Sequence, residues 1–156
     1  MKRFFTSASC AILAFASSLC AQEQTQAIEV TGPASANVTW DAVTGRTYFL
    51  QYSFDLENWL YDTTIDYADG SSSQLSKGMA ATSDKLFVRL YHADIPFTGS
   101  VDDADFDNDG VRNIDEITTL GGTNPFSGDS DGDGKSDWQE FAEGFDPKDG
   151  FTTDTS

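Results

Sequence analysis

The chain has few of the residues on which small exported domains and enzymes commonly depend. It contains two cysteines in 156 residues, Cys10 and Cys20, and both lie in an N-terminal segment that we expect to be removed. The remaining chain must be stable without the disulfides that extracellular domains can use. Its single histidine, His92, belongs to no Ser-His-Asp, Cys-His or zinc-ligand pattern. The sequence therefore predicts a protein that is not an enzyme.

Positively charged residues are also scarce. The chain has nine Lys and Arg against 26 Asp and Glu, for a net charge of −17. Residues 102–154 alone carry 16 acidic and three basic side chains. Nucleic acids and anionic membranes are bound through basic surfaces, so this balance excludes both as partners. Scattered acids would indicate a disordered, solubilising tail, but here they recur at fixed positions.

No apolar run is long enough to cross a membrane. The longest lies near the N-terminus, in MKRFFTSASCAILAFASSLCAQEQ, and covers about 15 residues where a spanning helix needs about 20. It follows Lys2 and Arg3 and precedes small residues, which is typical of a secretory signal peptide. We expect cleavage after Ala21, so residues 1–21 are removed; an uncleaved anchor is the alternative. The mature chain is then secreted or held at the cell surface, with no membrane insertion.

Residues 26–94 are rich in β-branched and aromatic residues, in short segments separated by turn formers such as Asp69-Gly70. Five or six strands, about ten residues apart, predict a mainly β fold: a small antiparallel β-sandwich. No helical periodicity persists in this part of the chain. The strands are expected at residues 28–31, 38–42, 47–54, 59–65 and 86–92.

Two stretches of this region, VTWDAVTGRTYFLQYSFDLENW and KLFVRLYHA, carry a resemblance. They are similar to the small fibronectin III-like sandwich domains of secreted bacterial proteins. In those domains an early tryptophan, a tyrosine-rich middle strand and a terminal F-x-R-L/V strand recur. The resemblance covers about residues 27–93 and implies a fold, without any activity.

The segment DIPFTGS, with its proline and glycine, predicts a linker over residues 95–101. Residues 102–149 beyond it contain a repeat, because residues 105–116 align with residues 129–140 at an offset of 24. Each copy fits the pattern D-x-D-x-D-G-x5-E of a calcium-binding loop at every diagnostic position. Residues 150–156 form a short tail.

Each loop offers the oxygen ligands that calcium prefers. Acids stand at loop positions 1, 3, 5 and 12, position 7 offers a backbone carbonyl, and position 9 typically acts through water. A glycine at position 6 allows the positive φ of the turn. So many carboxylates would repel one another without a cation, and magnesium fits less well because it prefers fewer protein ligands. The predicted ligands of two Ca²⁺ ions are Asp105, Asp107, Asp109, Val111, Asn113 and Glu116, and Asp129, Asp131, Asp133, Lys135, Asp137 and Glu140.

The loops differ from paired EF-hands, because Pro96 and Gly99 leave no entering helix before the first one. On the exiting side, apolar residues recur at helical spacing for about two turns, and Gly144 is placed to end the second helix. Because each unit is too small for a core of its own, we expect these stripes to be buried against a neighbour. The stripes are Ile114, Ile117 and Leu120, and Trp138, Phe141 and Phe145.

Each short helix is followed by a stop, GGTNP or GFDP. Loop, helix and stop together resemble the bacterial thrombospondin type 3 repeat over residues 105–149. The resemblance implies a calcium-wrapped chain in secreted or surface proteins, with the side chains at positions 1, 3, 5, 9 and 12 as ligands. Asn113 stands where that family more often has Asp, which would weaken the first site. A dockerin-like module, which also pairs two such loops, is the alternative, although its basic partner-binding helices have no counterpart here.

A carbohydrate-binding role is a further alternative, because small secreted sandwiches often hold sugars on exposed aromatic side chains. We expect Trp40 and about half of the tyrosines to form the core of the sandwich. Trp59, directly after a turn, is the candidate ligand-binding residue. The sequence favours a secreted, calcium-binding, modular protein with a structural or adhesive role, whose partner is an extracellular glycan or a surface protein.

Overall fold

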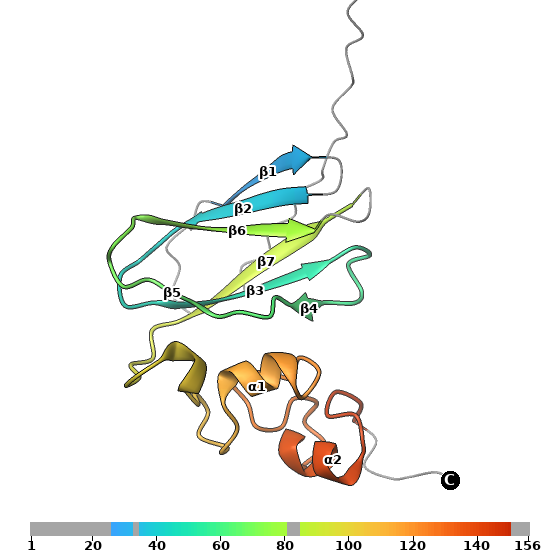
Figure 1. Ribbon diagram of the computed structural model, residues 1–156. Helices are drawn as coiled ribbons and strands as arrows, with labels where there is room; N and C mark the ends of the chain where they lie inside the picture. Colours follow the sequence, from blue (N-terminus) through green and yellow to red (C-terminus); the bar gives the residue numbers. More distant parts are fainter. Residues whose placement is uncertain (1–25, 33–34, 81–84, 151–156) are drawn as a thin grey trace, which may run out of the picture.

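The computed structural model describes residues 26–32, 35–80 and 85–150 of the chain (Figure 1). These residues form a mainly β fold with two antiparallel sheets and three short helices, which confirms the predicted fold class at this level. The predicted signal peptide, residues 1–21, lies outside the described residues, as does the predicted tail after Gly150. No helix among the described residues is long and apolar enough to cross a membrane.

The first sheet has three antiparallel strands in the order β1-β2-β6. They are β1 (Gln26–Gly32), β2 (Ser35–Asp41) and β6 (Gln74–Ala80). Strand β2 lies at the centre, and its register places Trp40 opposite both Gln26 and Leu75. β6 was not predicted, because its sequence QLSKGMA has only two large apolar residues and an internal glycine.

The second sheet is built around β3 (Thr47–Ser53), which pairs along one side with β7 (Phe87–Ala93). Along its other side β3 pairs with the two-residue strands β4 (Leu60–Tyr61) and β5 (Asp66–Tyr67). The single strand predicted over residues 59–65 is therefore wrong.

One half-buried lysine explains part of β6. Lys77 faces the second sheet, and its ammonium lies 2.8 Å from a carboxylate oxygen of Asp62 and 2.5 Å from one of Asp66. It also donates a hydrogen bond to the hydroxyl of Thr64. The alternating pattern of the strand thus continues through a charged residue, because the charge finds partners where an apolar side chain would otherwise stand.

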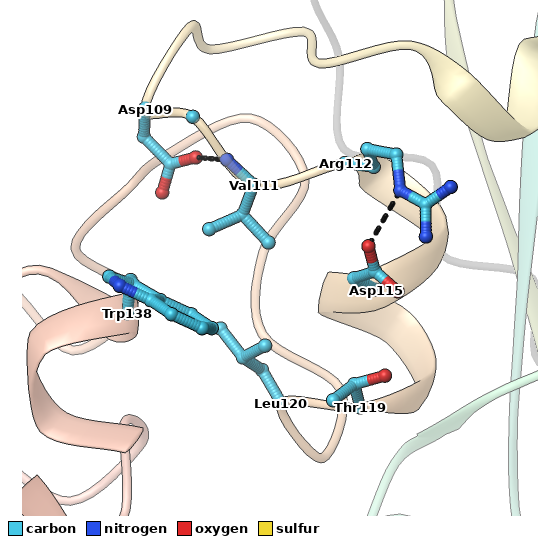
Figure 2. A pocket seen from close by; sticks show the side chains of 8 residues that line it. Asp109, Val111, Arg112, Asp115, Thr119, Leu120 and Trp138 are labelled. Atoms are coloured by element: carbon cyan, nitrogen blue, oxygen red, sulfur yellow. Dashed lines mark hydrogen bonds and ion pairs between the residues drawn. The ribbon is translucent and has the colours of Figure 1, made fainter. Parts of the chain in front are cut away.

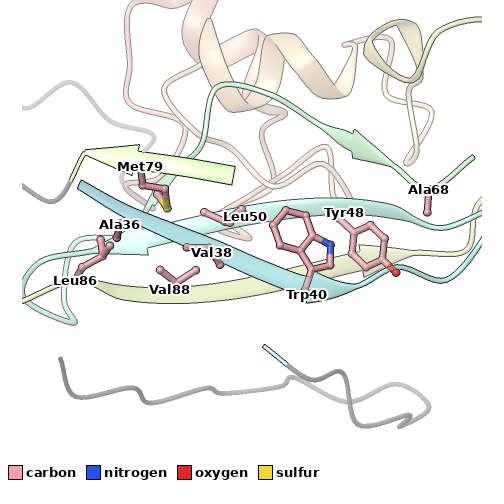
Figure 3. Close-up of a cluster of buried hydrophobic side chains, with 9 residues drawn as sticks. All are labelled: Ala36, Val38, Trp40, Tyr48, Leu50, Ala68, Met79, Leu86 and Val88. Carbon is pink, nitrogen blue, oxygen red and sulfur yellow. The ribbon is translucent and has the colours of Figure 1, made fainter. Parts of the chain in front are cut away.

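The main core lies between the two sheets (Figure 3). On β2, alternate side chains point inward, so Ala36, Val38 and Trp40 are buried while their neighbours are half-exposed. The ring centroid of Trp40 lies 6.0 Å from that of Tyr48 on β3. The prediction that Trp40 belongs to the core is confirmed.

Strand β3 is buried on both of its faces, because the C-terminal segment covers the side that faces away from β2 (Figure 1). A second cluster forms there, where side chains of the sheet meet side chains of the C-terminal segment. Its buried members are Phe49, Ile65, Ala93, Ala104, Phe106 and Ile117. Ile95 and Phe97, in the predicted linker, pack against the same cluster, so residues 95–101 lie on the sheet and are not a free spacer.

The three helices all lie in the C-terminal segment. They are the 3-10 helix η1 (Val101–Asp103), α1 (Asn113–Thr118) and α2 (Asp137–Glu143). η1 precedes the first acidic loop, and α1 and α2 leave the two loops as short helices of the predicted kind. Gly144 ends α2 in the left-handed conformation, with φ of 85°, as predicted.

Candidate metal centres

The three leading aspartates of each loop converge. In the first loop one carboxylate oxygen from each of Asp105, Asp107 and Asp109 lies within 4.8 Å of the others. The aspartates at positions 1, 3 and 5 of the second loop form an equivalent group. Either group could hold a metal ion, because three converging carboxylates supply the hard oxygen ligands of a divalent cation.

Hydrogen bonds within the first loop organise this convergence. Asp105 accepts the backbone N–H of Asn108 (2.8 Å) and that of Gly110 (3.1 Å) on its two oxygens. Asp107 and Asp109 each accept the N–H two residues ahead, at 3.2 and 2.7 Å. Gly110 has φ of 95°, which a side chain would oppose. Asp105 therefore shapes the loop with both oxygens, while Asp107 and Asp109 each use one oxygen for the loop and keep the other for a ligand.

The second loop repeats the same bonds. Asp129 accepts the N–H groups of Gly132 (2.7 Å) and Gly134 (3.0 Å), and Asp133 accepts that of Lys135 (2.8 Å). Gly134 has φ of 98°, matching its counterpart in the first loop. Because these bonds join residues at most five positions apart, the twelve-residue pattern specifies the local shape by itself.

The acids at position 12 provide the strongest sign of a cation. Glu116 and Glu140 are fully buried, and none of their four carboxylate oxygens has a hydrogen-bond partner within the described residues. Three aspartates also have one buried carboxylate oxygen each without a hydrogen-bond partner within the described residues: Asp107, Asp131 and Asp133. A buried, unpaired carboxylate costs several kcal/mol, so these groups fit the ligand set of a cation.

The pKa values show how unfavourable these charges are without a counter-ion. Burial, followed by the neighbouring charges of Asp107 and Asp109, raises the pKa of Glu116 to about 9. Burial and the charge of Asp109 raise the pKa of Asp107 to about 6. In the second loop, burial and the nearby aspartates raise the pKa of Glu140. A cation at the centre would reverse this, because it favours the ionised form of every ligand.

The side chains at position 9 close the loops. The Oδ1 atom of Asn113 accepts the backbone N–H of Phe106 (3.0 Å), and Oδ1 of Asp137 accepts that of Ser130 (2.8 Å). The other oxygen of Asp137 accepts the Ser130 hydroxyl at 2.7 Å. Both side chains are fully buried. They hold position 2 of the loop, and an amide makes the same backbone bond as a carboxylate. Asn113 lacks the charge of Asp137, so a weaker first site stays a prediction.

Val111 and Lys135 follow the glycine turns at position 7, as predicted. Val111 is buried, whereas the ammonium of Lys135 pairs with Glu143 and lies 4.7 Å from the ring centroid of Phe145. Their backbone carbonyls remain the predicted ligands at this position.

The two loops differ in what surrounds them. Phe106, at position 2 of the first loop, lies edge-on to Phe49 of β3, with 6.0 Å between ring centroids, and stacks against Phe126 at 6.2 Å. The equivalent residue of the second loop, Ser130, makes hydrogen bonds only within the C-terminal segment, to Asn124 and Asp137. The first loop is thus fastened to the sheet, and the second is not.

One close backbone approach joins the loops. A Cβ atom added to Gly128, just before the second loop, would lie 2.6 Å from Cβ of Asp109 in the first loop. Such a distance is too short for two carbon atoms without a shift of the backbone. Sequence reasoning missed this contact, because Gly128 occupies no position of the repeat pattern.

The predicted burial of the apolar stripes holds for α1 and fails for α2. Ile117 and Leu120 are buried, and Ile114 packs against the second cluster. Their counterparts on α2 are open: Trp138 is 53% exposed and Phe141 is 42% exposed. The reason is that α1 lies against the sheet, while α2 lies beyond it (Figure 1).

Trp59 directly precedes β4, and His92 lies in β7. The guanidinium of Arg89 covers one face of the Trp59 ring, 4.0 Å from its centroid, and the indole N–H donates to the Leu56 carbonyl (3.1 Å). His92 is half-buried with its ring edge toward Tyr48, and burial lowers its pKa. Its nearest ionised groups, Arg46 and Asp94, form an ion pair at 2.7 Å.

Comparison of the chain with known protein families, with curated proteins and with solved structures gave no match. The chemistry of the two loops therefore has to be interpreted from their geometry. Five of the predicted carboxylate ligands have buried oxygens without hydrogen-bond partners among the described residues. They are Asp107, Glu116, Asp131, Asp133 and Glu140. A metal ion would supply the missing partner.

Proposed function

We propose that the protein binds two calcium ions, one in each acidic loop, and that the ions are structural. The observation that carries this proposal is the burial of Glu116 and Glu140, whose oxygens have no hydrogen-bond partner within the described residues. Each glutamate follows three converging aspartates in the same loop. A divalent cation would neutralise these charges and satisfy the orphaned oxygens.

Calcium suits the loops better than magnesium does. Its six to eight ligands at about 2.3–2.6 Å tolerate irregular geometry, whereas magnesium demands a compact octahedron and keeps several waters. A loop with acids at positions 1, 3, 5 and 12 and a backbone carbonyl at position 7 offers more protein oxygens than magnesium commonly takes. Exported modules can work at affinities of about 10⁻⁴–10⁻³ M, because calcium is abundant outside cells.

The ions would act on stability. A ligand that binds only the folded form stabilises it by RT ln(1 + [Ca]/Kd), which is about 1.4 kcal/mol per site at a tenfold excess over Kd. As far as the structure describes it, the C-terminal segment has three short helices and no sheet of its own. Calcium would therefore supply much of the order that a core supplies elsewhere.

The fold supports an extracellular, non-enzymatic role. A small fibronectin III-like sandwich would have two antiparallel sheets that share one core, as this protein does. An acidic loop, a short helix and a Gly–Pro motif that ends the helix would also be expected of thrombospondin type 3 repeats. We interpret the protein as a secreted or surface-held structural and adhesive module, with a signal peptide over residues 1–21.

Calorimetry on the chelator-treated full chain tests this function. We expect calcium to bind at two sites, and Glu116→Gln and Glu140→Gln each to abolish or weaken one of them. Glu57→Gln, the same change at an exposed turn of the sheet region, should leave both sites intact. The proposal is wrong if several millimolar calcium gives neither heat of binding nor any change in amide chemical shifts.

A sugar site at Trp59 receives less support. Arg89 already stacks on one face of the indole, and the ring is held by its bond to Leu56. A sugar could stack only on the other face of the Trp59 ring.

A further inference from the structure

A pocket of about 520 Å³ opens between the two calcium loops (Figure 2). Its floor is apolar, formed by the buried side chains of Val111 and Leu120. One wall is the indole of Trp138, which extends from α2 across the pocket toward Leu120. The opposite rim comes from the first repeat and carries Arg112, Asp115 and Thr119.

The exposure of Trp138 is not explained by packing within the described residues. Its ring contacts the ring of Phe141, at 6.0 Å between centroids, and more than half of the residue stays open to solvent. Ile114, which is 24 positions earlier in the repeat, packs against the sheet. Trp138 and Phe141 together form an exposed aromatic patch, and contiguous patches of this kind commonly mark binding surfaces.

The rim offers hydrogen-bonding groups in which Arg112 offsets part of the acidic charge. The Nε atom of Arg112 lies 2.7 Å from a carboxylate oxygen of Asp115, and its NH1 atom lies 3.2 Å from one of Asp103. The guanidinium still has N–H groups to donate, the carboxylates can accept more bonds, and the Thr119 hydroxyl can do both. Apolar floor, aromatic wall and a few polar groups are the composition of a small-molecule site.

We propose that this pocket binds a neutral sugar residue of a glycan. A pyranose ring has an apolar C–H face, which would stack on Trp138, and peripheral hydroxyls, which would bond to Arg112, Asp115 and Thr119. The chain's net charge of −17 repels polyanionic glycans. A cationic ligand would meet Arg112, and both flanking acids are already paired with that residue.

Sugar binding in this pocket would depend on calcium. Asp109, Gly110 and Val111 line the pocket and also belong to the first loop, while Trp138 follows directly after position 9 of the second. This part of the inference rests on the calcium sites proposed above. Removing the ions would loosen both walls together, and the sugar would lose its stacking surface and its polar rim at once.

Glycan-array screening and calorimetry on the full chain in millimolar calcium test the site. The probes are cellohexaose, laminarihexaose, mannohexaose and chitohexaose, with heparin and polygalacturonate as anionic comparisons. We expect a neutral oligosaccharide to bind, Trp138→Ala to weaken it by about tenfold or more, and Thr119→Val to weaken it less. Leu60→Ala, which alters an exposed apolar residue of the sheet region, should have no effect.

The calcium titration of each variant, followed by calorimetry, separates the two proposals. Calcium binding without binding of any neutral glycan overturns the sugar site and leaves the proposed function standing. Weakening by Trp59→Ala instead of Trp138→Ala also overturns it, because the sugar would then lie on the sheets. Sugar binding that survives chelation overturns the calcium dependence, and failure of calcium to bind overturns the proposed function itself.

Discussion

The two acidic loops share one twelve-residue pattern and the same internal hydrogen bonds, yet they sit in different surroundings. In the first loop, Phe106 and Ile117 are buried against the sheet. At the equivalent places of the second loop stand Ser130, which bonds locally, and Phe141, which is 42% exposed. The same local pattern is therefore packed against the sheet in one copy, whereas the described contacts of the other copy lie within the C-terminal segment.

This difference bears on how each loop depends on its ion. Apolar contacts hold the first loop near its binding geometry even before a cation arrives, and preorganisation of this kind favours affinity. The second loop has no such apolar packing on the sheet among the described residues, and local hydrogen bonds must oppose the repulsion among its carboxylates. We therefore expect the second loop to lose its order first when calcium is withdrawn.

The largest effect should come from cutting the link between the first loop and the sheet. Phe106→Ala would leave a cavity between Phe49 and Phe126 and should lower the free energy of unfolding by about 3–5 kcal/mol, as for other buried phenylalanines. Ser130→Ala, at the equivalent position of the second loop, should cost about 1 kcal/mol through its lost hydrogen bonds. Urea unfolding in calcium measures both, and equal costs would contradict the asymmetry.

Replacing the acid at position 12 of one loop at a time should distinguish the effects of the two proposed calcium sites. We expect Glu116→Gln and Glu140→Gln each to weaken calcium binding at one site by about tenfold or more, because one charged ligand is lost. Hydrogen exchange followed by mass spectrometry should then show Glu140→Gln loosening only residues 129–149. Glu116→Gln should also loosen residues that pack on the sheet. If Glu140→Gln loosened β3 as well, the two calcium sites would not have separate structural roles.

The backbone contact between the loops gives an intermediate effect. Gly128→Ala would press a methyl group against Asp109 and should cost about 1–3 kcal/mol, as overpacking does. The matched control is Gly78→Ala in β6, where an added Cβ meets nothing within 4 Å and φ is not positive. That change should be neutral or stabilise the fold by up to about 1 kcal/mol. Thermal unfolding in calcium compares the two, and a silent Gly128→Ala would mean that the loops are not in contact.

The smallest effect should come from an ion pair that calcium does not touch. Both oxygens of Asp94 accept hydrogen bonds from Arg46, at 2.7 and 2.9 Å, and this lowers the pKa of Asp94. A lowered folded-state pKa gives stability that is present above the unfolded value of about 3.9 and is lost as the pH falls through the folded value. Because Asp94 is largely exposed, the gain should be below about 1 kcal/mol.

Asp94→Asn tests this in chelator, by denaturant unfolding at a series of pH values. The difference in stability between the wild type and the variant should be constant near neutral pH and should vanish in acid, below the ordinary pKa of aspartate. A difference that grows as the pH falls would have the wrong sign for this ion pair. Such a result would show that Arg46 does not hold Asp94 in its charged form.

Much of this protein could be predicted from short-range pattern. The alternation of Ala36, Val38 and Trp40 predicts a strand with one buried face. The acids and glycines of the loops predict the convergence of the carboxylates, since the hydrogen bonds described within each loop join residues at most seven positions apart. The end of α2 at Gly144 was predictable for the same reason. In each case the physical cause lies within a few residues of its effect.

What lies between distant residues was decided only by the tertiary structure. β6 exists because β2 supplies its partners and because Asp62 and Asp66 neutralise Lys77, and none of this shows in the sequence QLSKGMA. The apolar stripes of α1 and α2 look alike along the chain, but just one of them meets the sheet. Burial is a property of two surfaces together, so a sequence can state which side chains would gain from burial, while the fold determines which of them receive a partner.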